Sequence, residues 1–201
     1  MKYKYLFTKK FYNENPRDEY KAQSIAGFII KLYGSDAEDM INQIAKEDLS
    51  NERLASTERD AEIIAGLNNA GDVIRYMRKS IDPLNRRAFL NKILLFEEEI
   101  LPDVIEKIKK SGNDYYIESA TQLLSLSENN YSVKLMDIFD DIKNSYAQSM
   151  MLVVIGFKGD EEVIPWMFDK YFKYKNSSYD DGDRAQGALI AFDELFDRFY
   201  S

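Results

Sequence analysis

The feature of this sequence that most constrains its fold is a repeat with a period of 31 or 32 residues. Residues 100–105, 131–136 and 163–168 align with one another, and residues 71–74 form a weaker fourth copy. A helical unit of this length cannot bury its own apolar face, so neighbouring units must stack to share a core. The repeat therefore predicts a stack of helices, an architecture that commonly presents an extended surface to a partner.

Composition favours helices and excludes several kinds of chemistry. The chain has 201 residues, of which only 9 are Gly and 4 are Pro, so residues that make turns are scarce. It contains neither Cys nor His. Disulfides, thiol nucleophiles, most zinc sites, haem ligation and histidine-dependent triads all require one of these residues. A glycine-rich phosphate-binding loop is also missing from the sequence, and we expect no catalytic residues, no metal and no cofactor.

Hydropathy predicts a protein without membrane segments. Residues 1–7 are basic but lack the apolar stretch of a signal peptide. The longest apolar runs, such as residues 152–155, are far shorter than the roughly 20 residues that span a bilayer. We therefore expect a soluble, cytoplasmic protein.

Charge is unevenly distributed along the chain. The net charge is -8, which disfavours nucleic acid as a partner. Residues 73–96 nevertheless carry six Lys or Arg and a single Asp, between two acidic stretches. The sequence thus contains a basic segment that is either functional or simply a solvated helix face.

Apolar periodicity and capping residues predict helices throughout. Asn15 is the expected N-cap of the first helix, which ends at Gly34, and a second helix opens at Ser35. Further helices are expected at about 52–69, 73–79, 83–98, 102–110, 114–126, 132–143, 145–157, 161–175 and 184–199. Residues 176–183 are the best candidate for a mobile loop. Residues 1–11 are expected to form a loose lead-in helix or tail, with an edge strand as the alternative because Lys and Tyr alternate there.

One turn carries a family resemblance. Residues 155–167 read IGFKGDEEVIPWM and resemble the turn inside HEAT-type repeats, in which a first helix runs into Gly-Asp and the second opens with an apolar residue and Pro. Residues 100–102, Ile-Leu-Pro, match the second half of this signature, although glutamates 97–99 replace its Gly-Asp. In the copy between them, Val133 stands where the signature has Pro. The resemblance covers about residues 55–199.

The resemblance implies an all-α α-solenoid of about five stacked antiparallel helix pairs in a right-handed superhelix. We expect a single domain over residues 1–201, with an N-terminal arm (1–16), irregular helices (17–70) and more regular repeats (71–199). In HEAT-like stacks the second helix of each pair lines the concave face.

Side chains off the apolar stripes of the second helices are the candidate binding residues, and in chain order they change from basic to acidic. Together with two arginines of the neighbouring first helix and one lysine beside Trp166, the candidates are Arg75, Arg78, Lys79, Arg86, Arg87, Lys107, Lys110, Asp137, Asp141, Trp166 and Lys170. Trp166 is either an exposed interface anchor or a partly buried packing residue. Residues 180–183 fail the spacing of a calcium-binding EF-hand loop.

The function that these features favour is a non-enzymatic scaffold that binds a protein or peptide partner in a dipolar groove. One alternative is an immunity- or antitoxin-type inhibitor of a basic protein. Another is a nucleic-acid-binding enzyme, because HEAT-like repeats also form a group of alkylpurine DNA glycosylases. In that case the basic cluster and Trp166 would have to hold the duplex.

Overall fold

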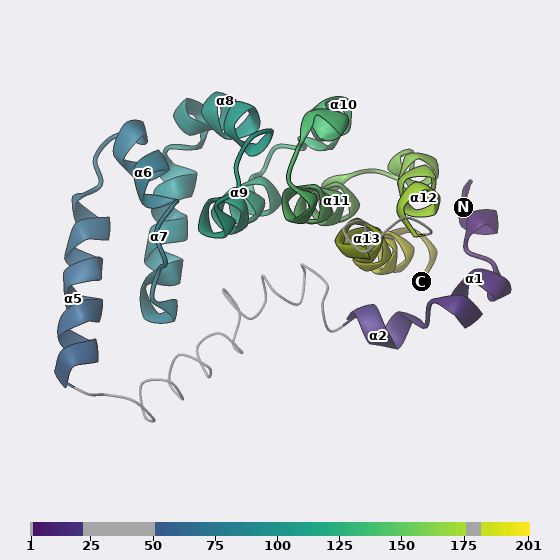
Figure 1. Ribbon diagram of the computed structural model, residues 1–201, viewed down its shortest axis with the longest axis horizontal. Coiled ribbons are helices and arrows are strands. Elements are labelled where there is room, and N and C mark those ends of the chain that lie inside the picture. The colour runs from purple at the N-terminus through teal and green to yellow at the C-terminus, as the bar shows by residue number, and fades with distance from the viewer. Residues whose placement is uncertain (1, 22–50, 176–181) are drawn as a thin grey trace.

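The computed structural model describes residues 2–21, 51–175 and 182–201, and in these ranges the chain is all-α, with no strand (Figure 1). The α-helices are α1 (Lys9–Glu14), α2 (Arg17–Lys21), α5 (Asn51–Gly66), α6 (Ala70–Tyr76), α7 (Pro83–Leu95), α8 (Glu97–Ile108), α9 (Asp114–Leu126), α10 (Ser132–Ile138), α11 (Ser145–Lys158), α12 (Val163–Tyr174) and α13 (Gly182–Tyr200). Two 3-10 turns, η1 (Lys4–Leu6) and η2 (Phe139–Asp141), complete the described structure. The expected helix at Ser35 and most of the expected loop at 176–183 lie outside the described residues.

The helices form two rows that follow an arc. Figure 1 shows α6, α8, α10 and α12 along the outer side of the arc and α7, α9, α11 and α13 along its inner side. Within the inner row α7 packs beside α9, α9 beside α11, and α11 beside α13, while α6 packs beside α8 in the outer row. In each of these pairs, a helix contacts the helix two places further along the chain.

The aligned positions of the sequence repeat occupy equivalent places in the outer row. Val104, Leu135 and Met167 are fully buried on α8, α10 and α12, four residues after the aligned first positions. Four residues further on, Ile108, Phe139 and Tyr171 are also buried. Side chains four residues apart lie on one helix face, so each outer helix turns the same stripe toward the inner row.

The inner-row helices begin at a regular interval too. Asp82, Asn113 and Asn144 lie 31 residues apart, and their side chains accept hydrogen bonds from backbone N–H groups in the first turns of α7, α9 and α11. These residues satisfy amide groups that have no partner within the helix. Asn113, for example, is the N-cap of α9 and accepts from the Tyr116 amide.

Several predicted helix limits were wrong. Pro102 lies inside α8, which begins five residues earlier at Glu97. Gly71 and Asp72 lie within α6 and do not break a helix. On α5, Ile64 is buried, whereas Ala61 and Ala65 are exposed. Pro102 is the sixth residue of α8, where it removes one internal hydrogen bond, so this Pro does not mark the start of the helix.

The N-terminal segment packs against the last helices of the stack. Phe7 and Phe11 are buried, and the Phe7 ring lies 5.1 Å from Phe168 of α12 and 5.6 Å from Phe192 of α13. Asn15 is the buried C-cap of α1, where its side chain accepts a hydrogen bond from the Tyr171 hydroxyl, and so it is not the N-cap of α2. Residues 1–11 therefore include the predicted lead-in helix in part, as η1 and the start of α1, but the segment is packed against the stack and is neither a loose tail nor an edge strand.

The centre of the core is the pair α9 and α11. Residues 119–125 of α9 and 151–156 of α11 are buried without interruption, so these helices are covered on every side. The outer row is instead buried along one stripe and exposed elsewhere. The second helices thus lie on the outer side of the arc, whereas the resemblance had led us to expect them on its concave face (Figure 1).

Candidate functional site

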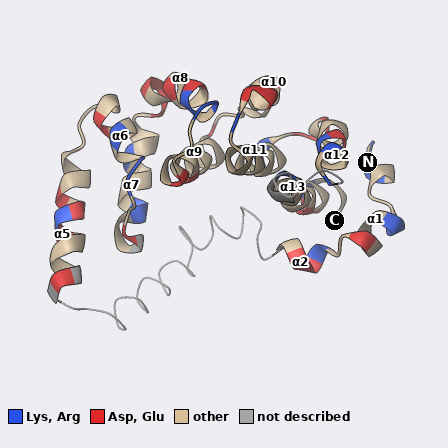
Figure 2. Ribbon diagram, in the orientation of Figure 1, with Lys and Arg blue, Asp and Glu red and all other residues tan. Residues whose placement is uncertain are grey.

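The exposed charges of the repeats lie mainly on the outer row. Figure 2 shows both signs of charge on α8, α10 and α12, whereas α11 is almost free of charged residues. Most of the predicted binding residues lie on this row or on the turns that follow its helices. The outer row is therefore the surface on which the sequence predictions can be compared with the structure.

A hollow of about 310 Å³ lies between the end of α6 and the second half of α8. It is lined by Arg78, Asp103, Glu106, Lys107, Lys110 and Ser111. Lys107 forms an ion pair with Asp103 at 2.8 Å, and the Arg78 guanidinium lies over the Tyr116 ring, 5.6 Å from its centre. No ion pair joins Arg78 or Lys110 to another residue in the described ranges, so both cations are free to meet an anion. The structure thus brings together three of the predicted residues, Arg78, Lys107 and Lys110.

The remaining basic residues do not join this hollow. Arg75 forms an ion pair with Asp72 on its own helix, and Lys79 is exposed in the following turn. Arg86 is mostly buried on α7 and reaches Glu118 of α9 at 3.4 Å; burial lowers the pKa of its guanidinium. Residues 116 and 118 of α9 are about 200° apart around the helix, so Arg78 and Arg86 lie on opposite sides of it. Arg87 is exposed beside Arg86, and the predicted basic cluster is therefore divided between the two rows.

Trp166 is a packing residue. Its ring meets that of Phe139 edge to face, with the centres 5.2 Å apart, and Lys170 lies over both rings. The Lys170 ammonium is largely buried and donates hydrogen bonds to both oxygens of Asp140, at 2.7 and 2.8 Å. These contacts join η2 to α12, so Trp166 and Lys170 stabilise the stack. Asp137 and Asp141 are exposed on either side of this contact.

Charge is separated between the two ends of the outer helices. We define the acidic edge as residues 95–99, 127–131 and 158–162, the turns between inner and outer helices, which carry seven carboxylates and one lysine. The basic edge comprises residues 77–82, 109–113 and 142–144, and it carries five cations and one carboxylate. Acidic residues at helix starts and basic residues at helix ends complement the helix dipole, which accounts for this polarity.

Hydrogen bonds between successive turns show that each edge is continuous. Along the acidic edge, Ser127 donates to Glu97 at 2.5 Å, and Lys158 donates to the Ser127 carbonyl at 2.6 Å. Along the basic edge, the Lys143 amide donates to the Lys109 carbonyl at 3.1 Å. Sequence order had suggested a charge gradient along the stack; the structure adds a separation across it, which only the antiparallel packing of the helices creates.

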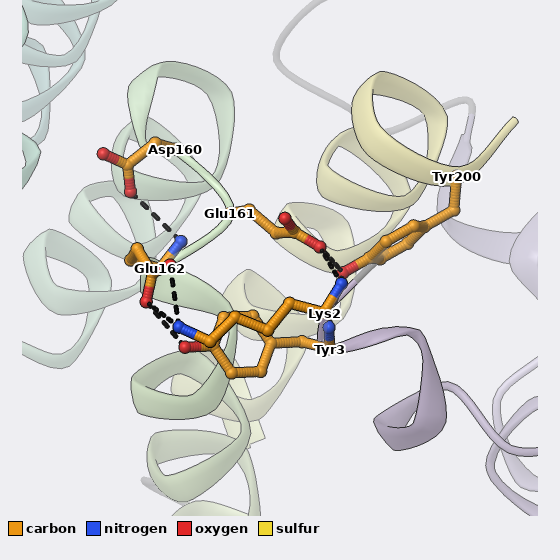
Figure 3. A network of polar contacts seen from close by, with 6 residues as sticks. All are labelled: Lys2, Tyr3, Asp160, Glu161, Glu162 and Tyr200. Atoms are coloured by element: carbon orange, nitrogen blue, oxygen red, sulfur yellow. Dashed lines mark hydrogen bonds and ion pairs between the residues drawn. The ribbon is translucent and has the colours of Figure 1, made fainter.

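The chain's own N-terminal segment is bound at one end of the acidic edge (Figure 3). The Lys2 ammonium donates to Glu162 at 3.1 Å, and the Tyr3 hydroxyl donates to the same carboxylate at 2.6 Å. Glu161 accepts hydrogen bonds from the Lys2 amide at 2.7 Å and from the Tyr200 hydroxyl at 2.6 Å. We call these contacts the N-terminal latch. Sequence reasoning missed it, although residues 3, 7 and 11 are aromatic at the four-residue spacing of one helix face.

The latch carboxylates are stabilised in their charged form. The hydrogen bond from Tyr200 lowers the pKa of Glu161, and those from Tyr3 and Lys2 lower the pKa of Glu162, below the usual value of 4.5. Burial raises the pKa of Tyr200 to about 12, and its bond to Glu161 acts in the same direction. The hydroxyl therefore remains a donor at neutral pH.

The lowered pKa values of Glu161 and Glu162 predict that the latch opens in acid. A group with a lowered pKa in the folded state stabilises the fold above its unfolded pKa, and this contribution is lost as the pH falls through the folded value. The contribution should thus be complete above about pH 4.5 and decline below it. Because the chain has no Cys, a Tyr5→Cys variant can carry one non-titrating, environment-sensitive dye on the N-terminal segment. We expect its emission to change on acidification, and the change to be smaller when Glu162→Gln is also present.

The same acid transition with and without Glu162→Gln would show that another group controls the opening. Glu128→Gln is the matched control, because Glu128 is an exposed carboxylate of the acidic edge that forms no part of the latch. This control should leave the transition unchanged.

The described residues contain no group of three or more His, Cys, Asp or Glu side chains placed to hold a metal ion. In the same part of the chain, no helix is both long enough and apolar enough to cross a membrane. Comparison with protein-family models, with curated proteins and with solved structures found no match. The surface features of the two edges are therefore the basis for a functional proposal.

Proposed function

We propose that this chain is a non-enzymatic, protein-binding scaffold: a single-domain, HEAT-like α-solenoid of about five helix pairs in a right-handed superhelix. Its docking surface is the outer row, and its partner contributes an acidic segment that lies in the hollow between α6 and α8. The observation that carries the proposal is the convergence of Arg78 and Lys110, two cations without an ion-pair partner among the described residues, in one hollow of about 310 Å³.

The surroundings of the hollow suit a carboxylate-rich peptide. Lys107 can exchange its intramolecular partner Asp103 for a ligand carboxylate, because that pair is partly exposed and such pairs contribute little to stability. Arg78 stacks on Tyr116, which holds its planar guanidinium in a fixed orientation. Charge complementarity of this kind sets specificity and the rate of association.

A defined peptide tests the proposal. We expect a labelled peptide of alternating glutamate and leucine to bind the wild-type chain at low salt, as measured by fluorescence anisotropy. Arg78→Glu combined with Lys110→Glu should weaken binding by at least about tenfold, because each reversal replaces attraction by repulsion. Lys9→Glu combined with Lys10→Glu is the matched control, since both lysines are exposed on α1 at the other end of the arc. Equal affinities in the two double variants would overturn the proposal.

The two alternatives differ in what supports them. A DNA glycosylase would need the basic cluster and Trp166 in one groove, but the cluster is divided between two rows and Trp166 packs on Phe139. A shift of labelled duplex DNA at low salt, abolished by reversal of Arg78 and Lys110, would favour that alternative. An inhibitor of a basic protein gains support from the carboxylates of the acidic edge.

A further inference from the structure

The acidic edge contains a larger hollow, of about 520 Å³, at the junction of α7 and α8 with the end of α9. Its apolar part consists of Leu94, Leu95, Phe96 and Leu126, and its polar part of Glu97, Glu98, Glu99, Glu128 and Asn129. The Leu95 side chain is 71% exposed, more than any other large apolar residue in the described ranges. The hollow therefore combines one exposed apolar side chain with several carboxylates on the same side of the molecule.

One carboxylate of this hollow is already used by the fold. Glu97 accepts hydrogen bonds from Ser127, Asn129 and Tyr131, at 2.5, 3.3 and 2.8 Å. Burial opposes the charge on Glu97, but the three bonds together outweigh it and lower the pKa. Glu97 therefore stays ionised and ties the two turns together. Glu98, Glu99 and Glu128 are exposed, and no ion pair joins them to another described residue.

The chain itself shows what such carboxylates bind. In the repeat alignment, Glu98 and Glu99 precede Ile100 as Glu161 and Glu162 precede Val163. Ile100 and Val163 are both buried, on α8 and α12, but the local structure of the two acidic pairs differs: Glu98 and Glu99 lie in the first turn of α8, whereas Glu161 and Glu162 lie in the turn just before α12. The pair before α12 holds Lys2 and Tyr3 through the N-terminal latch (Figure 3).

We propose that the hollow at Leu95, Glu98 and Glu99 is a second docking site, which takes a basic and aromatic segment of a partner protein. A lysine of that segment would meet Glu98 and Glu99, and its aromatic or aliphatic side chain would cover Leu95. This site is separate from the cationic hollow at Arg78, and its chemistry is the opposite. The occupant is assigned from charge complementarity and from the Lys-Tyr segment that is bound at the aligned acidic pair.

A peptide copy of the N-terminal segment is the appropriate probe. We expect a labelled Lys-Tyr-Lys-Tyr-Leu-Phe peptide to bind the full chain, and the same peptide with Glu in place of both Lys to bind at least about tenfold more weakly. Glu98→Gln with Glu99→Gln should weaken binding by roughly tenfold, and Leu95→Ser should also weaken it. Both changes are at exposed side chains, so the fold should be retained, which circular dichroism can verify. Glu58→Gln with Glu62→Gln is the matched control, because it removes the same charge from exposed positions on α5.

Three outcomes would overturn the assignment. Binding that survives Glu98→Gln with Glu99→Gln but is lost with Glu161→Gln and Glu162→Gln would mean that the peptide merely displaces the chain's own N-terminal segment. Self-association of the wild-type chain that Leu95→Ser abolishes, measured by sedimentation, would make a second copy the occupant in place of a partner. Unchanged peptide affinity in all carboxylate variants would remove the site altogether. These measurements use a basic peptide and variants outside the cationic hollow at Arg78. Failure of the proposed function would therefore leave their results unchanged.

Discussion

Replacement of Gly156 by Ala is expected to destabilise the protein by about 2–3 kcal/mol, although it adds a single methyl group. A Cβ atom at Gly156 would lie 2.4 Å from the Cβ of Ala191 and 2.6 Å from its Cα. Real Cβ atoms do not approach other carbons this closely, and the backbone of α13 cannot rotate away as a long side chain could. α11 and α13 would have to separate along a closely packed contact.

A second contact makes that separation costly. Gly187 of α13 lies against Ser149 of α11, where an added Cβ would be 2.5 Å from the Ser149 carbonyl oxygen. Small residues therefore bring α11 and α13 together at two places along their lengths, in the parallel sense that a repeat requires. A shift that relieves one contact disturbs the other.

Thermal or denaturant unfolding measures the effect, and the chain offers a matched control. For a chain of this size, the melting temperature of Gly156→Ala should fall by roughly 4–12 °C. Gly66 ends α5 and has no atom within 4 Å of an added Cβ, so Gly66→Ala should be neutral or stabilising by up to about 1 kcal/mol. Similar stability in the two variants would mean that α11 and α13 are further apart than described here.

The repeat could be predicted from the sequence because burial imposes it on each unit. Val104, Leu135 and Met167 differ in type but share the property of being apolar, and that is enough to reveal a stack. The helices predicted at 83–98, 114–126 and 145–157 agree with α7, α9 and α11 to within three residues. Arg78, Lys107 and Lys110 were among the predicted candidates because they lie off the buried stripes, but their meeting in one hollow was not predicted.

Long-range packing could not be predicted in the same way. Arg86 and Arg78 are both arginines in predominantly basic stretches of sequence. Nothing in the neighbouring residues shows that Arg86 pairs with Glu118 and that Arg78 lies over Tyr116. Which row lies on the outer side of the arc depends on small differences in packing between helices. The acidic edge also escaped notice, because its turns become neighbours only after the helices have stacked antiparallel.

The N-terminal segment illustrates this limit most clearly, and it leads to the second large expected effect. Phe7→Ala should destabilise the protein by about 3 kcal/mol, the usual cost of removing a buried Phe side chain. The ring meets those of Phe168, Phe192, Phe196 and Tyr200 edge to face, with centres between 5.1 and 5.8 Å away. Such aromatic pairs add to the free energy of burial, and Ala can replace none of them.

Equilibrium denaturation of the full chain provides the measurement, with Tyr5→Ala as its control. Tyr5 lies two residues away but its side chain is 69% exposed, so its removal should change stability by less than about 0.5 kcal/mol. If the N-terminal segment belongs to the same cooperative unit as α12 and α13, Phe7→Ala will shift the whole transition to lower denaturant. A transition that stays in place while a protease gains access to residues 2–14 would instead mean that the segment docks on an already stable stack. We expect the whole transition to shift, because Phe7 and Phe11 share one aromatic cluster with α12 and α13. An unshifted transition would require that the stack is equally stable without this cluster.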